Sequence, residues 1–268
     1  MATFRRDGIQ FHYIDQGEGF PVVFQHGLGS DAAQVAELLP QLAGVRTILL
    51  DSRGHGQTRP LGDPQKLNFN SLVDDVMALL DRLGVGQAVF GGISMGAGMA
   101  LNAVSRYPAR VLGLVLVRPA WLEQPMPDNL RGITLIGRLI RERGAGPGRE
   151  EFMRSAEYAR LVQEGPEAAA SLLRQFEDPY AVETAVKLER IPLDAPVRSR
   201  TAWTQVRVPA LVLVNDHDPV HPMEMGRVLA AHIPRAELVE ITSKSVSPEG
   251  YRADLRAAIT PFIGRLRP

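Results

Sequence analysis

Short apolar runs alternate with amphipathic stretches along much of the chain. The runs over residues 21–24, 47–50 and 206–214 are too short for buried helices, contain β-branched side chains and end in polar or glycine-rich residues. These features are typical of parallel strands that are covered on both faces. Similar runs predict further strands at residues 88–90, 111–117 and 237–241.

The stretches between these runs carry apolar side chains at helical spacing. One of them ends at Gly84, and its apolar residues share one helical face: Leu72, Val76, Leu79, Leu80 and Leu83. Helices are also expected at residues 95–107 and 223–231, and after Ser247, which with Pro248 supplies an N-cap and a first turn. Alternating strands and helices predict an α/β fold with a doubly wound, mostly parallel sheet.

Residues 120–205 break this alternation. They contain helical patterns and no convincing strand, with glycine- and proline-rich connections at residues 144–148 and 165–166. The helices are expected at residues 130–143, 149–162 and 167–176. We therefore expect a core domain built from residues 1–119 and 206–268, and a helical insertion over residues 120–205.

Composition narrows the class of function. The chain has 268 residues, 30 basic and 30 acidic side chains and no cysteine. Zero net charge disfavours nucleic acid and membrane surfaces as partners, and the lack of cysteine excludes thiolate chemistry and disulfides. No apolar run approaches the roughly 20 residues of a membrane helix, and the N-terminus does not resemble a secretory signal. These features predict a cytoplasmic protein that acts on a small molecule without a metal or cofactor; they leave the oligomeric state open.

Ser94 stands in the one segment whose pattern predicts nucleophilic chemistry. Gly92-Ile-Ser-Met-Gly96 follows a predicted strand and opens a predicted helix, which is the context of a G-x-S-x-G nucleophile elbow. Glycines flank such a serine because neighbouring Cβ atoms would obstruct the sharp turn. The alternative is a glycine-rich turn with an incidental serine.

Together with this segment, three others make the sequence resemble the α/β-hydrolase superfamily, in particular its small esterase, haloperoxidase and epoxide-hydrolase-like branch. Residues 25–29 (QHGLG) look like that family's oxyanion loop, and residues 51–56 (DSRGHG) look like its D-x-R-G-x-G signature. Residues 215–222 (NDHDPVHP) look like the segment that carries the family's catalytic acid. The resemblance implies an α/β-hydrolase fold in which residues 120–205 form a helical cap.

The resemblance also implies roles for individual residues. Ser94 matches the nucleophile and Asp218 the acid, while the backbone N–H groups of Leu28 and Met95 match the oxyanion hole. His26 matches a loop position near the substrate pocket, and both it and His55 are expected to shape loops rather than to catalyse.

The family's general base is a histidine after the last strand, but the last histidine of this chain is His232. Three substitutes are considered. His217 and His221 flank Asp218, although so short a loop makes it difficult for one side chain both to reach the serine and to be braced by Asp218. Lys244 stands near the vacated position, but its pKa would have to fall by about three units.

Arg118 and Trp121 follow the strand after the nucleophile helix and are expected near the mouth of the substrate pocket. They could clamp an acidic or aromatic ligand, or simply form a salt bridge and a packing contact. The sequence thus predicts an enzyme acting on an ester, lactone or related carbonyl compound through Ser94, with an incomplete or atypical triad. The alternative is a lyase, isomerase, cyclase or ligand-binding protein of the same fold.

Overall fold

The computed structural model describes residues 2–267. An eight-stranded sheet forms the centre of the molecule. The strands lie in the order β1-β2-β4-β3-β5-β6-β7-β8. Their bounds are β1 Ala2–Arg6, β2 Ile9–Gln16, β3 Phe20–Gln25, β4 Val45–Leu50, β5 Ala88–Ile93, β6 Val111–Val117, β7 Ala210–Val214 and β8 Ala236–Glu240. All six strands predicted from apolar runs are present, but the hairpin of β1 and β2 was not predicted.

The sheet is parallel from β4 to β8, and only β1 and β2 pair antiparallel to their neighbours. The strand order reverses at β3, which lies between β4 and β5. In open α/β sheets a ligand binds outside the carboxyl ends of the strands at such a reversal. The loops that follow β3 and β5 therefore meet at the expected position of a binding site.

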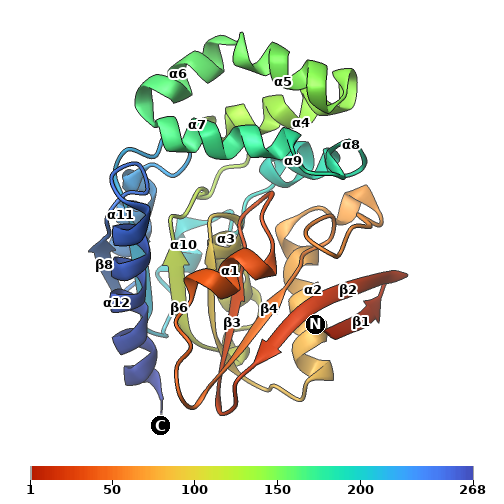
Figure 1. The fold of residues 1–268 in the computed structure, drawn as a ribbon. Coiled ribbons are helices and arrows are strands. Elements are labelled where there is room, and N and C mark those ends of the chain that lie inside the picture. The colour runs from red at the N-terminus through yellow and green to blue at the C-terminus, as the bar shows by residue number, and fades with distance from the viewer. Residues whose placement is uncertain (1, 268) are drawn as a thin grey trace.

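Helices cover both faces of the sheet (Figure 1). Helices α1 (Ala32–Leu38) and α12 (Pro248–Leu266) bury their apolar side chains against one face. Helices α2 (Phe69–Arg82), α3 (Met95–Arg106) and α11 (Met223–His232) pack against the other. The Ser247 side chain accepts a hydrogen bond from Gly250 N and caps α12, which confirms the N-cap predicted there.

A layer of further helices lies across the carboxyl-terminal edge of the sheet, at the top of Figure 1. Its members are α4 (Arg131–Arg143), α5 (Ala145–Met153), α6 (Ala156–Glu164), α7 (Pro166–Leu173), α8 (Ala181–Thr184) and α9 (Val186–Arg190). The short helix α10 (Arg200–Trp203) instead contacts α11 in the body. No helix within residues 2–267 is long and apolar enough to cross a membrane.

The predicted glycine-rich connection at residues 144–148 is wrong, because only Gly144 is a turn and the rest begins α5. Pro147 is tolerated there, since the N–H groups of a first helical turn have no intrahelical acceptor. The helix predicted over residues 149–162 is in fact two helices. They separate at Ser155, whose side chain caps α6 by accepting a hydrogen bond from Tyr158 N.

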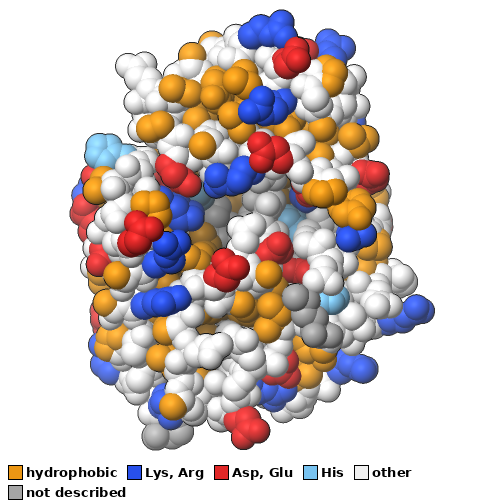
Figure 2. Space-filling view, viewed as in Figure 1, with side chains coloured by type: hydrophobic (Ala, Val, Ile, Leu, Met, Phe, Trp, Pro, Cys, Tyr) orange, Lys and Arg blue, Asp and Glu red, His pale blue; other side chains and the backbone are white. Residues whose placement is uncertain are grey.

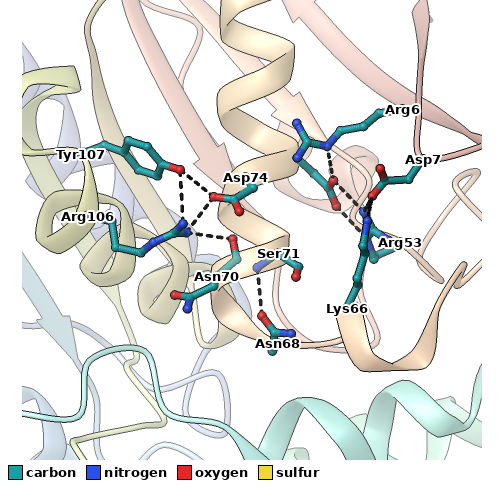
Figure 3. Close-up of polar contacts among 11 residues, drawn as sticks. Arg6, Asp7, Arg53, Lys66, Asn68, Asn70, Ser71, Asp74, Arg106 and Tyr107 are labelled. Atoms are coloured by element: carbon teal, nitrogen blue, oxygen red, sulfur yellow. Dashed lines mark hydrogen bonds and ion pairs between the residues drawn. The ribbon is translucent and has the colours of Figure 1, made fainter.

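Ion pairs tie α2 to the loop that follows β4 (Figure 3). Arg53, which is 1% exposed, donates two hydrogen bonds of 2.7 Å to Asp75 on α2, and Arg6 of β1 contacts the same carboxylate at 3.1 Å. Asp74 accepts hydrogen bonds from Arg106 and Tyr107. Removing one partner of the buried Arg53–Asp75 pair costs about 3–5 kcal/mol, so this pair holds the loop of residues 51–56 against α2.

Candidate active site

Ser94 lies on a sharp turn between β5 and α3. Its backbone has φ +56° and ψ −109°, a conformation that non-glycine residues rarely adopt, and its N–H donates to Val117 O at 2.9 Å. A Cβ built on Gly92 would come within 2.3 Å of Gly96, and one built on Gly96 within 2.2 Å of Gln25 O. Both glycines are therefore required by close backbone approach, as the elbow pattern predicts.

The loop that follows β3 passes next to Ser94. A Cβ built on Gly27 would lie 3.6 Å from Ser94 Cβ. Within residues 2–267 neither the Leu28 N–H nor the Met95 N–H donates a hydrogen bond to the protein. The two groups proposed from the sequence as an oxyanion hole are thus available to a ligand.

A cavity of about 640 Å³ lies between the helical layer and the sheet. In Figure 2 the surface is hollowed below the helical layer, and acidic and basic side chains gather around the hollow. The cavity wall contains most of the residues expected from the sequence: Leu28, Ser94, Arg118, Trp121, Asp218, His221 and Lys244. Segments far apart along the chain, from His12 to Lys244, thus meet at one cavity.

Asp218 and His221 form a buried pair on the loop that follows β7. His221 Nδ1 lies 2.9 Å from Asp218 Oδ2, while Asp218 Oδ1 accepts hydrogen bonds from the N–H groups of Val220 and His221. Of the two requirements set out for a base on this short loop, the structure shows one: the turn brings His221 against Asp218. His221 Nε2 makes no hydrogen bond to any described residue.

Charge and burial set the protonation of this pair. Burial lowers the pKa of His221 and outweighs the nearby Asp218 charge, which raises it, so the imidazole is neutral at pH 7. Burial alone would raise the pKa of Asp218, but His221 and Arg118 hold it well below its usual range. A neutral histidine beside an ionised carboxylate can accept a proton through Nε2.

Arg118 and Lys244 bring positive charge to the same wall. Arg118 Nη1 donates to Asp218 Oδ2 at 2.9 Å, and its guanidinium carbon lies 5.3 Å from the centre of the Tyr251 ring. Lys244 Nζ lies 4.9 Å from the same ring. Burial, and after it the charge of Arg118, lower the pKa of Lys244 to about 8.

Of the remaining candidates, two histidines lie outside the cavity wall and a tryptophan belongs to it. The His217 side chain is 62% exposed, contacts Asp216 and does not line the cavity. His26 is buried outside the cavity wall, where Nδ1 donates to Gly27 O and Nε2 accepts from Ser52 N. Trp121 lines the cavity but is 2% exposed and packs edge-on against Phe69. Of these three, only Trp121 lies in the cavity wall.

Sequence reasoning missed three residues that matter here. Lys187 on α9 is 3% exposed, lines the cavity and donates to Gly54 O, and burial lowers its pKa to about 8. Tyr251 is fully buried beneath Arg118 and Lys244, and His12 is a second histidine in the cavity wall. One signal was present in the sequence: only three basic residues are lysines, and two of them, Lys187 and Lys244, line the cavity.

The fold and this arrangement of loops define a class of protein. The alpha/beta hydrolase fold family matches residues 21–244, and the chain belongs to that family. The family resemblance seen in the sequence is thereby confirmed. The chain is a hydrolase-fold enzyme related to esterases, enol-lactonases and haloperoxidases.

Particular relatives span most of the chain. A 2-hydroxymuconate semialdehyde hydrolase from Pseudomonas sp. (strain CF600) is 28% identical over 247 residues, which cover 86% of this chain and 82% of the relative. A 3-oxoadipate enol-lactonase from Acinetobacter baylyi is 23% identical, covering 95% and 94%. By contrast, the match to a putative non-heme haloperoxidase of Mycobacterium phage D29 is 35% identical but spans less than half of either chain, 47% of this one and 45% of the other.

The crystal structure of the enol-lactonase from Burkholderia xenovorans LB400 is similar along the whole chain. Its TM-score is 0.74 at 25% identity, covering 99% of both chains. A thermophilic esterase from Thermogutta terrifontis has a TM-score of 0.75 at 24% identity, covering 97% of this chain and 95% of that one. The second similarity supports the fold alone.

Proposed function

We propose that this chain hydrolyses a carboxylic ester or lactone through an acyl-enzyme on Ser94, with His221 as general base and Asp218 as its positioning residue. The observation that carries the proposal is the 2.9 Å contact between His221 Nδ1 and Asp218 Oδ2 in the cavity that Ser94 also lines. It supplies the braced imidazole that the sequence lacks after β8. The relatives named as hydrolases and lactonases support the same class of reaction.

The proposed reaction assigns a step to each of these groups. Ser94 Oγ attacks the carbonyl carbon while its proton passes to His221 Nε2, and the Leu28 and Met95 N–H groups stabilise the oxyanion. Collapse of the intermediate breaks the bond to the leaving oxygen, which takes the proton from Nε2. Water then attacks the acyl-enzyme by the same route and releases the acid and Ser94.

His221 is favoured over Lys244 because of what each side chain contacts. His221 has an ionised carboxylate on one nitrogen and leaves the other free. Lys244 has no carboxylate oxygen within 4.0 Å among the described residues, and it stands over the Tyr251 ring. Ser94 Oγ makes no hydrogen bond to either group, and contacts of this kind often tighten only when substrate binds.

The test compares two serines of the cavity wall, Ser94 and Ser171. A fluorophosphonate probe should label wild type and Ser171→Ala, with peptide mass spectrometry locating the label on Ser94. Ser94→Ala should lose labelling and at least about 10³-fold in kcat/KM for p-nitrophenyl acetate. Equal labelling or turnover in Ser94→Ala would contradict the proposal and favour a non-hydrolytic or ligand-binding function.

A further inference from the structure

Lys244 is a largely buried ammonium group with no carboxylate oxygen within 4.0 Å among the described residues. Glu167 and Asp218 act on it from a longer distance, and each has another partner. Asp218 is shared by Arg118 and His221, and Glu167 lies 3.6 Å from Arg174. Moving an unpaired ammonium away from water is costly, so its retention in a cavity wall needs an explanation.

The nearby guanidinium of Arg118 increases the free-energy cost of burying the Lys244 ammonium. Arg118 and Lys244 both lie against Tyr251, at 5.3 and 4.9 Å from the ring centre, and repel each other. Arg118 adopts φ +46°, in the left-handed region, at the end of β6, and its buried Nε makes no hydrogen bond within residues 2–267. The wall formed by Asp218, Arg118 and Lys244 therefore carries one negative and two positive charges.

Tyr251 holds the two cations in place without neutralising them. The ring belongs to α12 and is fully buried, so it offers a fixed aromatic surface to the guanidinium and to the ammonium. The phenol remains uncharged at neutral pH because burial raises its pKa. On this part of the wall two cations therefore face one carboxylate, while other acidic side chains of the cavity wall, such as Glu177 and Asp178, come from the helical layer.

We propose that Arg118 and Lys244 form an anion subsite that recognises a carboxylate of the substrate. The substrate is then an ester or lactone bearing a free carboxylate a few bonds from the carbonyl that Ser94 attacks. This inference rests on the proposed function. A carboxylate suits the pair because it can accept hydrogen bonds from an ammonium and a guanidinium at once.

The first experiment compares two isosteric esters, the mono-4-nitrophenyl ester of glutaric acid and its neutral analogue, 4-nitrophenyl glutaramate. Wild type should prefer the anionic ester at pH 7, after subtraction of the enzyme-free rate. Lys244→Met keeps the apolar stem over Tyr251 and removes the charge, so the ratio of kcat/KM values, anionic over neutral, should fall about 10- to 100-fold. Lys66→Met, at a lysine outside the cavity wall, is the matched control and should keep the wild-type ratio.

Two results would overturn the inference. One is a wild-type ratio near unity; the other is an equal loss on both esters in Lys244→Met, which would assign Lys244 to the chemical step or to folding.

A binding measurement separates this inference from the proposed function. Glutarate should bind Ser94→Ala in titration calorimetry, and adding Lys244→Met should weaken its Kd about tenfold or more. If glutarate binding depends on Lys244 but ester turnover does not depend on Ser94, the anion subsite is supported and the proposed hydrolysis is contradicted. If turnover depends on Ser94 but glutarate does not bind, the proposed hydrolysis is supported and the anion subsite is contradicted.

Discussion

The two sides of the cavity are built by different means. The side next to β3 and β5 consists of backbone, namely the strained turn at Ser94 and the N–H groups of Leu28 and Met95, packed so tightly that only glycine fits at neighbouring positions. The side next to β6, β7 and β8 consists of charged side chains, where Arg118, Asp218 and His221 hold one another. The first side is restricted by steric contact at Gly92 and Gly96, whereas the second depends on charge and hydrogen bonding between side chains.

The largest effect is expected from a substitution in the backbone side of the cavity, at Gly96. Gly96→Ala places a Cβ 2.2 Å from Gln25 O, so the elbow must shift, and we expect a loss of several kcal/mol in unfolding free energy together with loss of activity. Gly264→Ala is the control, because nothing lies within 4 Å of its Cβ in α12 and alanine favours a helix by about 1 kcal/mol. Thermal unfolding measures both, and equal melting temperatures would show that the elbow is not tightly packed.

This difference also explains what the sequence could predict. The elbow lies within five consecutive residues, and glycine is needed where two backbones approach, so a local pattern locates Ser94. Local patterns likewise predicted the buried strands β3 to β7, the edge strand β8 and the main helices of the body. The charged side joins residues from three loops. The contact of His221 with Asp218 lies within one turn, but nothing local indicates that Lys244 and Arg118 lie against the same ring.

Elements that depend on packing rather than pattern were also missed. The β1–β2 hairpin lies at the edge of the sheet, and the helical layer contains short helices such as α8 and α9, each too brief to show a period. Lys187, on α9, owes its role to the contact with Gly54, 133 positions away. The role of such a residue is recognised only from the three-dimensional structure, which shows how the helical layer packs on the sheet.

The next largest effect is expected from replacing His221, the proposed general base on the charged side of the cavity. His221→Gln should lower kcat by about 10²–10⁴-fold, because glutamine cannot take the Ser94 proton, while the oxyanion donors retain the remaining activity. His217→Gln is the matched control from the same loop, since that side chain is exposed and outside the cavity wall. Steady-state kinetics with p-nitrophenyl acetate separates the two variants. Similar losses in both would show that the loop, and not the imidazole, is needed.

The pH dependence of wild-type activity distinguishes His221 from Lys244 as the general base without any substitution. Burial lowers the pKa of His221 below its ordinary 6.5, and the base must be neutral to act. The acid limb of kcat/KM for a neutral ester should therefore have its midpoint below pH 6.5, with activity rising as pH increases through it. A base at Lys244, whose pKa is about 8, would place the midpoint about 1.5 units or more higher. A limb near pH 8 would thus reassign the base to Lys244.

The smallest expected effect concerns Lys187, which joins the helical layer to the loop that follows β4. Burial lowers its pKa from 10.5 to about 8, so between these values the unfolded chain holds a proton that the folded chain has released. Unfolding free energy should therefore gain at most about 1.4 kcal/mol per pH unit from this residue as pH rises through that window. Lys187→Met should lack this gain, so the stability difference between the two proteins should change in favour of wild type from pH 8 to pH 10. Urea unfolding at these two pH values measures it, and a constant difference would show that the lysine is solvated and does not seal the layer onto the sheet.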